Sequence, residues 1–321
     1  MASKLTNTEE PAPEGSVRLK TRLGPLLFVE HSSIAEGIQR KGFHDVGVEY
    51  FMQKYRDRLF PFIDVGANVG LFAITAAHLN PSGAVFAFEP DAANLVLLRK
   101  NLELTGQTGV QVESTACSSK NGTIRMGSIN CGLSRKSKQD ASKVDCQTLL
   151  SFCQCEGIVP AFVKIDVEGA EIDVLKGLYA DEDFSDTAIE LEFSWRDHGR
   201  HIEALLDLLP AEKYDYEFLL TDSERGPFYA LDWPEEFWSE VHDRLYPTGF
   251  IACLAQGPGQ VQRVLELLQN STEILHSRKW ELCITPRSLT RMPGADPLTD
   301  FAFGEAGRLR RALRWVRQLR H

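Results

Sequence analysis

The stretch that decides the fold is Phe62-Ile63-Asp64-Val65-Gly66-Ala67-Asn68-Val69-Gly70. An apolar run ends at the acidic residue Asp64, and Gly66 and Gly70 then let the backbone turn tightly under a ligand. The next apolar run ends at a second acid, Glu89. Because ligands of open α/β sheets bind at the carboxyl ends of the strands, this pattern predicts a nucleoside site in which Glu89 holds the ribose hydroxyls.

The cofactor that this pattern favours is a nucleoside without phosphate. Dinucleotide sites use G-x-G-x-x-G, which places the pyrophosphate on a helix N-terminus, and here Asn68 stands where the second glycine is required. The carboxylates of Asp64 and Glu89 would repel a pyrophosphate but suit a cation. We therefore expect S-adenosylmethionine rather than NAD. The alternative is that the glycines only turn the chain after a strand.

Composition and charge limit the other possibilities. The chain has 321 residues, enough for one large α/β domain or two small ones, and its net charge of −10 argues against nucleic acid as a partner. Its seven cysteines show neither a disulfide-scaffold pattern nor metal-site spacing, so no metal is expected. Without an apolar signal region or a membrane-spanning window, the sequence predicts a cytoplasmic protein.

The pattern along the chain predicts four parts. We expect a disordered tail at 1–16, a hairpin and a helix beginning after Asp45 at 17–59, the cofactor-binding domain at 60–255, and a helical extension at 256–321. Strands are predicted at 62–65, 85–89, 110–113, 162–166, 188–192, 216–220 and 250–254. Helices are predicted at 69–79, 91–105, 145–156, 168–178, 201–209 and 234–245. This alternation predicts an α/β fold with a seven-stranded, Rossmann-like, doubly wound and mostly parallel sheet, and 120–143 as a long connection on its ligand side.

A second informative segment is Lys164-Ile165-Asp166-Val167-Glu168-Gly169-Ala170-Glu171. A predicted strand delivers Asp166 to its carboxyl end, and a helix follows immediately. Glu171 has a plain alternative explanation, since the helix macrodipole favours acids in the first turn. A purely structural role explains Asp166 and Lys164 less easily, because they are charged residues in an otherwise apolar strand. The segment therefore indicates a functional site.

These segments together resemble the FkbM family of methyltransferases over roughly residues 45–220. The resemblance rests on the glycine stretch, on Phe88-Glu89-Pro90, on the run from Lys164 to Glu171, and on Ala116-Cys117-Ser118, Asn130-Cys131-Gly132-Leu133-Ser134 and Leu191-Glu192-Phe193. It implies a class I methyltransferase fold and transfer of a methyl group from S-adenosylmethionine to a hydroxyl of a sugar, glycan or glycosylated metabolite. The expected cofactor residues are Asp64, Gly66, Ala67, Asn68, Gly70, Glu89, Pro90, Ala116, Cys117 and Asp166. Glu113-Ser114-Thr115 departs from the family pattern beside the adenine.

Methyl transfer to a hydroxyl also calls for a general base within hydrogen-bonding reach. The candidates at the same sheet edge are Asp166, Glu168, Glu192 and His198. Asp166 has an equally good alternative role, facing the amino group of the methionine moiety. A different class of function also stays open: a nucleotide-sugar or NAD-binding enzyme, or a non-catalytic binding module, on the same sheet.

The C-terminal region adds two observations. Residues 277–287 resemble the tail of many bacterial polysaccharide glycosyltransferases, which points toward glycan assembly. Residues 308–321 hold six arginines and no acid around one apolar helical face. A basic amphipathic helix of this kind predicts docking to a partner protein or to the inner membrane surface. The alternative is packing across the protein's own acidic surface.

Overall fold

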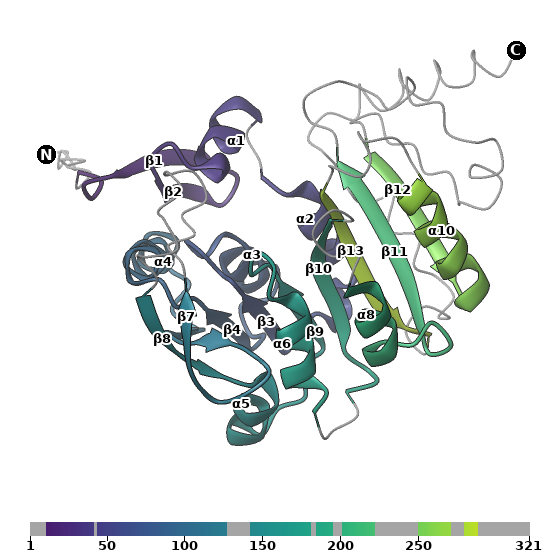
Figure 1. Ribbon diagram of the computed structural model, residues 1–321. Coiled ribbons are helices and arrows are strands. Elements are labelled where there is room, and N and C mark those ends of the chain that lie inside the picture. Colours follow the sequence, from purple (N-terminus) through teal and green to yellow (C-terminus); the bar gives the residue numbers. More distant parts are fainter. Residues whose placement is uncertain are drawn as a thin grey trace, which may run out of the picture.

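The computed structural model of this chain describes residues 11–41, 44–126, 142–180, 184–194, 201–221, 250–270 and 279–287, and all structural statements below concern these ranges (Figure 1). The expected helix at 234–245, the loop 130–134, His198 and the basic segment 308–321 lie outside them.

The centre of the molecule is an eight-stranded sheet. Its strands follow the order β12 (Phe250–Gln256), β11 (Tyr214–Thr221), β13 (Lys279–Pro286), β10 (Ala188–Ser194), β9 (Phe162–Ile165), β3 (Phe62–Val65), β4 (Val85–Phe88) and β5 (Val110–Glu113). From β10 to β5 all neighbours pair in parallel, whereas β13 is antiparallel to β10 and β11, and β12 is antiparallel to β11. The predicted α/β class and mostly parallel sheet are confirmed.

Two expectations about the sheet need correction. It has eight strands rather than seven, and one of them, β13, comes from the region 256–321 that was expected to be helical. The interior place between β10 and β11 belongs to β13, and the same region also holds α10 (Pro258–Asn270). The sequence contained the signal, because Leu282-Cys283-Ile284 is an unbroken apolar run typical of a strand buried on both faces.

Helices cover both faces of the sheet, as a doubly wound fold requires (Figure 1). One core lies under α5 (Leu149–Glu156), α6 (Glu171–Leu178), α8 (Ile202–Leu208) and α10. The other lies under α1 (Ser33–Lys41), α2 (Val46–Lys54), α3 (Leu71–Leu79) and α4 (Ala92–Thr105). Local chemistry sets several bounds: the Asp91 carboxylate caps the first turn of α4, and Gly106 ends that helix in the left-handed region.

The N-terminal part docks onto the core through one buried side chain. β1 (Ser16–Thr21) and β2 (Gly24–Val29) form the expected antiparallel hairpin. Asn101 of α4 accepts a hydrogen bond from the Leu27 amide at 2.7 Å and donates to the Leu27 carbonyl at 2.8 Å. The single helix expected after Asp45 is shorter than predicted, because α2 ends at Lys54 and the 3₁₀ turn η1 (Arg56–Arg58) follows.

A small second sheet stands beside the carboxyl ends of the main strands. It contains β6 (Ala116–Cys117), β8 (Ser142–Gln147) and β7 (Gly122–Met126), in that order. The stretch expected as a plain connection therefore carries β7 and the beginning of β8. Residues 145–147, expected to start a helix, belong to β8, because Thr148 caps α5 only after them.

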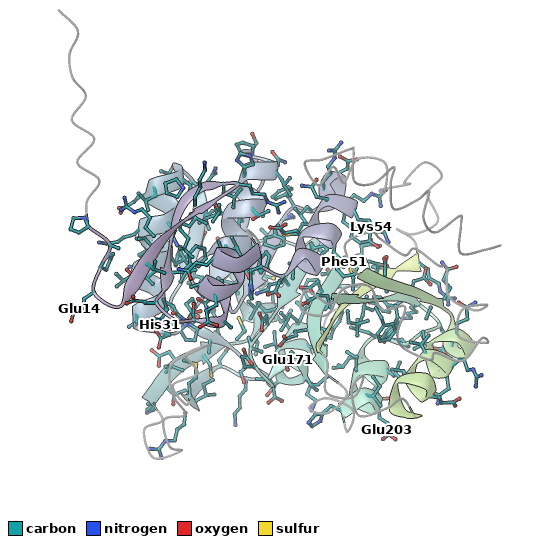
Figure 2. All side chains as sticks on the ribbon, turned by 90° about the horizontal axis from the view of Figure 1, so that it is seen from above. Glu14, His31, Phe51, Lys54, Glu171 and Glu203 are labelled. Carbon is teal, nitrogen blue, oxygen red and sulfur yellow. The ribbon has the colours of Figure 1, made fainter. Side chains whose placement is uncertain are left out.

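The two faces of the main sheet differ sharply in polarity. On the face toward α2 and α3, a row of polar side chains lies in register across five strands: Asp64, Lys164, Glu190, Cys283 and Glu217. All five are buried, whereas the opposite face is apolar. Buried charges are stable only when they are paired. Figure 2 labels Lys54 of α2. This helix packs beside β11 and β13, and Lys54 forms such a pair with Glu217.

This pairing gives a stability prediction. Lys54→Met should destabilise the fold by about 3–5 kcal/mol, because it leaves the Glu217 carboxylate buried without its cation. Urea unfolding measures the loss. The double variant Lys54→Met/Glu217→Leu should recover most of the stability, since it removes both charges; a double variant as unstable as the single one would contradict the argument.

Candidate functional site

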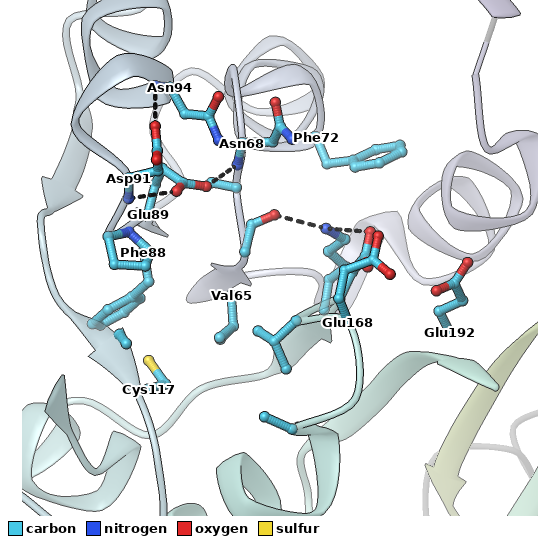
Figure 3. Close-up of a pocket in the computed structure, with 18 of the residues that line it drawn as sticks. Val65, Asn68, Phe72, Phe88, Glu89, Asp91, Asn94, Cys117, Glu168 and Glu192 are labelled. Carbon is cyan, nitrogen blue, oxygen red and sulfur yellow. Dashed lines mark hydrogen bonds and ion pairs between the residues drawn. The ribbon is translucent and has the colours of Figure 1, made fainter. Parts of the chain in front are cut away.

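A cavity of about 700 Å³ opens at the carboxyl ends of β3, β4 and β9 (Figure 3). The loops that follow these strands line it, together with β6, β7, and the residues just before α2. Glu192 of β10 and Glu281 of β13 complete the lining on the other side. The cavity therefore lies where open α/β sheets bind their ligands.

Most of the predicted site residues line this one cavity. They are Gly66, Ala67, Asn68, Glu89, Pro90, Ala116, Cys117, Asp166, Glu168 and Glu192. Asp64 and Gly70 do not line it, and His198 lies outside the described residues. The structure thus brings together segments at five strands, β3, β4, β6, β9 and β10, that the sequence could only place at a common edge.

Gly66 is needed for a reason other than ligand access. Its φ is +79°, and a Cβ at this position would lie 1.9 Å from the carbonyl oxygen of Asp166. The loops after β3 and β9 therefore touch through their backbones, with Asp166 N donating to Val65 O at 3.0 Å. Any side chain at position 66 would push the two halves of the site apart.

Glu89 is held rigidly at one end of the cavity. Its carboxylate accepts hydrogen bonds from the backbone amides of Asn68 and Asp91, both at 2.8 Å (Figure 3). Burial raises the pKa of Glu89 to about 7, against the opposing effect of these hydrogen bonds. A carboxylate has further lone pairs, so Glu89 can still accept from ligand hydroxyls.

Asp64 acts from behind the cavity instead of lining it. The side chain is fully buried, accepts a hydrogen bond from the Ala73 amide in the first turn of α3 at 3.0 Å, and forms an ion pair with Lys164 at 3.2 Å. Lys164 also approaches Asp166 at 3.6 Å and donates to the Gly66 carbonyl at 3.3 Å. Burial lowers the pKa of Lys164, but Asp64 and Asp166 outweigh it and raise the pKa, so the ammonium stays charged.

The segment after β9 brings carboxylates to the other end of the cavity. Figure 3 shows Glu168 and Glu192 on the side away from Glu89. Glu168 has a φ of +56°, a left-handed conformation that is rare for a residue with a side chain and often marks a functional site. Glu171 lies in the first turn of α6 and accepts a hydrogen bond from the Gly169 amide at 2.9 Å. It therefore stabilises the start of this helix, the structural role considered for it above.

Several lining residues were not among the sequence candidates. His44 and Asp45 form an ion pair at 2.7 Å, and Phe72 and Glu281 line the cavity as well. Burial lowers the pKa of His44, but Asp45 outweighs it and raises the pKa. No local motif marks these residues, since they reach the site only through tertiary packing. Lys164 was noticed in the sequence, but its ion pairs depend on strand register.

The described ranges contain neither a cluster of metal-binding side chains nor a membrane-spanning helix. No group of three or more His, Cys, Asp or Glu side chains there is arranged to hold a metal ion. Likewise, none of the helices in that part of the chain is long and apolar enough to cross a membrane.

Comparisons with known proteins agree with the geometry. Residues 64–218 match the family model described as the methyltransferase FkbM domain. The chain is 28% identical over 165 residues to "Methyltransferase 1" of Beauveria bassiana. This match covers 40% of this chain and 65% of that protein. The chain therefore spans just under two thirds of the length of this curated relative.

Solved structures of methyltransferases are similar at low identity. The FkbM methyltransferase from Methylobacillus flagellatus matches with 19% identity and a TM-score of 0.37, over 51% of this chain and 43% of that one. A Pyrococcus abyssi tRNA (uracil-54, C5)-methyltransferase, solved in complex with S-adenosyl-L-homocysteine, matches with 13% identity and a TM-score of 0.35, over 59% of this chain and 37% of that one.

The anchoring of Glu89 predicts how ligand affinity depends on pH. Glu89→Gln should weaken S-adenosylmethionine binding at least about tenfold, because one charge-assisted hydrogen bond contributes roughly 1.5–3 kcal/mol. In the parent protein, affinity should fall as pH drops below about 7, where Glu89 gains a proton and loses acceptor capacity. Calorimetry at several pH values measures both effects.

The matched control is Glu103→Gln, an exposed acid of α4 outside the cavity lining. It should leave the affinity unchanged. Equal affinities for the parent protein and the folded Glu89→Gln variant would remove Glu89 from the binding site.

Proposed function

We propose that this chain, whose residues 64–218 match the model of the methyltransferase FkbM domain, transfers a methyl group from S-adenosylmethionine to a hydroxyl oxygen of a sugar, a glycan or a glycosylated metabolite. The observation that carries the proposal is a single cavity with two different ends. Glu89, fixed by two backbone amides, lies at one end, and Asp166, Glu168 and Glu192 lie at the other.

The lining fits S-adenosylmethionine by its chemistry. Glu89 offers acceptors for ribose hydroxyls, and the carboxylates of Asp166 and Glu168 suit a ligand with sulfonium and ammonium charges. The small residues Gly66 and Ala67 leave room beside the backbone. When bound, this cofactor would supply an electrophilic methyl group to the acceptor oxygen, with its sulfur as the leaving group.

The chain's own residues have two tasks in such a reaction. They hold the acceptor in line with the methyl group, and they take up the proton that the hydroxyl loses. Lys164 keeps Asp166 in place at 3.6 Å. Asp166 therefore serves either as the base or as the partner of the cofactor's amino group, while Glu168 and Glu192 face the same cavity.

We propose that the acceptor is a small molecule or a glycan rather than a nucleic acid. A negatively charged chain whose cavity is rich in carboxylates repels a phosphate backbone. We also keep the proposal of a cytoplasmic protein that docks to a partner or a membrane surface through 308–321. Deletion of 308–321 should then lower recovery of the protein with anionic vesicles or with a partner.

The cofactor assignment has a direct test. S-adenosylmethionine should bind with micromolar-range affinity and NAD should not bind, because the cavity presents carboxylates where a pyrophosphate needs donors. Calorimetry with both ligands decides between the proposal and the alternative of an NAD or nucleotide-sugar enzyme. Tight NAD binding without S-adenosylmethionine binding would refute the proposal.

The roles at the end of β9 can be separated by kinetics. If Asp166 or Glu168 takes the proton, Asp166→Asn or Glu168→Gln should lower single-turnover methylation about 10²-fold or more, with a much smaller change in cofactor affinity. Equal losses in rate and affinity would make Asp166 a cofactor ligand. The control is Asp173→Asn, an exposed acid in the first turn of α6. Full activity in both test variants would exclude this segment from catalysis.

A further inference from the structure

Two carboxyl groups at the floor of the cavity have no role in the function proposed so far. Glu190 of β10 and Glu281 of β13 lie on neighbouring antiparallel strands, where Glu192 is directly opposite Glu281. Because side chains alternate along a strand, Glu190, Glu192 and Glu281 share one face. Glu281 and Glu192 line the cavity, and Glu190 is fully buried beneath it.

The charges around this pair do not balance. The groups that act on Glu190 are Lys164, Asp166, Asp45 and Glu281, and those that act on Glu281 are Glu190, Asp45 and Glu192. Lys164 is the cation in this set, and Asp64 and Asp166 already hold its ammonium. The remaining cationic candidate nearby, His44, is paired with Asp45. If both groups were ionised, they would lack a counter-charge among the described residues, which is strongly unfavourable for the fully buried Glu190.

Hydrogen bonding leads to the same conclusion. With both groups ionised, neither carboxylate oxygen of Glu190 has a hydrogen-bond donor among the described residues. Glu190 and Glu281 are diagonal neighbours on one face of two antiparallel strands, a placement that lets two long side chains meet. Two carboxylates offer each other only acceptors, so a bond between them requires a proton on one of the two.

We propose that Glu281 is a neutral carboxyl group that donates a hydrogen bond to the Glu190 carboxylate, and that the pair relays the proton lost by the acceptor hydroxyl. This rests on the proposed function and assigns the uptake of that proton to Glu281, which leaves Asp166 as the partner of the cofactor's amino group. The hydroxyl's O–H bond breaks and its proton forms an O–H bond with the free oxygen of Glu281. The proton that Glu281 already carried moves to Glu190, and the electron pair left on the acceptor oxygen forms the new bond to carbon.

The burial of Glu190 favours proton uptake by the pair. Taking up the proton turns a pair with one buried negative charge into a neutral pair, so the low-dielectric surroundings favour the transfer. Glu281 is the catalytic residue here because it lines the cavity, and Glu190, which lies behind it, is a positioning residue and proton sink.

The protonation equilibria support this geometry. Burial raises the pKa of Glu190 from 4.5 to about 8, and burial together with Glu190 raises the pKa of Glu281 well above its usual range. The relay needs Glu190 ionised and Glu281 neutral, so turnover should increase as pH rises through about 8. Because the native state holds protons that the unfolded chain releases above pH 4.5, stability should fall as pH rises from about 4.5 to 8.

The first test detects the proton without any turnover. Infrared difference spectra at about pH 9 should show the band of a neutral carboxyl group in the parent protein. The band should be lost in Glu281→Gln and retained in Glu217→Gln, which removes a buried carboxyl from the same row but outside the cavity. A parent protein without the band would overturn the proposal.

The second test measures the relay. Glu281→Gln keeps the side-chain volume but cannot exchange protons, so kcat should fall about 10²-fold or more, with the cofactor Kd unchanged. In Glu190→Gln, the rise of kcat with pH through about 8 should disappear, and stability should depend less on pH between 4.5 and 8. Glu217→Gln should keep both pH profiles of the parent.

The outcomes separate this inference from the proposed function. Full turnover and an unchanged pH profile in both Gln variants would overturn the relay, even with methyl transfer confirmed in the parent. A parent protein that transfers no methyl group would contradict the proposed function and the relay together, and the infrared band would still decide whether Glu281 holds a proton.

Discussion

The ammonium group of Lys164 joins the two strands on which the rest of the site depends. It lies 3.2 Å from Asp64 on β3 and 3.6 Å from Asp166 on β9, and it donates to the carbonyl of Gly66 between them. Burying a lysine is unfavourable unless carboxylates surround it, so these groups stabilise each other only in this one arrangement. The pairs therefore fix the positions of both loops before any ligand arrives, and Gly66 permits the backbone contact that such closeness requires.

This constraint divides the cavity into two ends with different chemistry. On the β4 side, backbone amides fix the carboxylate of Glu89, a geometry suited to hydroxyl recognition. On the β9 and β10 side, carboxyl groups gather around a single buried cation that is already neutralised. Such a site attracts positive charge at its open face and holds protons at its buried face. The proposed cofactor binding and the proposed proton uptake thus have a common origin in the excess of carboxyl groups at this end.

Where the chemistry is local, the sequence predicted site residues most of which line this cavity. The glycine stretch, Glu89 and the run from Lys164 to Glu171 each mark a strand end, and parallel strands bring those ends together. It failed where the role depends on register or packing. Asp64 looked like a ligand contact, yet it pairs with Lys164 behind the cavity. Glu281 belongs to a strand that inserts from far along the chain, and nothing in its neighbours reveals that it lies beside Glu190.

The polar row across the sheet explains why that late strand matters for function as well as for the fold. β13 places Cys283 in register between Glu190 and Glu217, so the row of buried polar groups continues from the cavity to Lys54 on α2. A sheet closed by an apolar strand would pack more favourably, since paired buried charges gain little over hydrophobic contacts. The carboxyl groups buried on this face are therefore best explained by a role in the reaction proposed for the neighbouring cavity. The position of β13 sets the proposed protonation of Glu190 and Glu281. With Cys283 opposite Glu190, Glu281 lies two residues away along β13, where it lines the cavity.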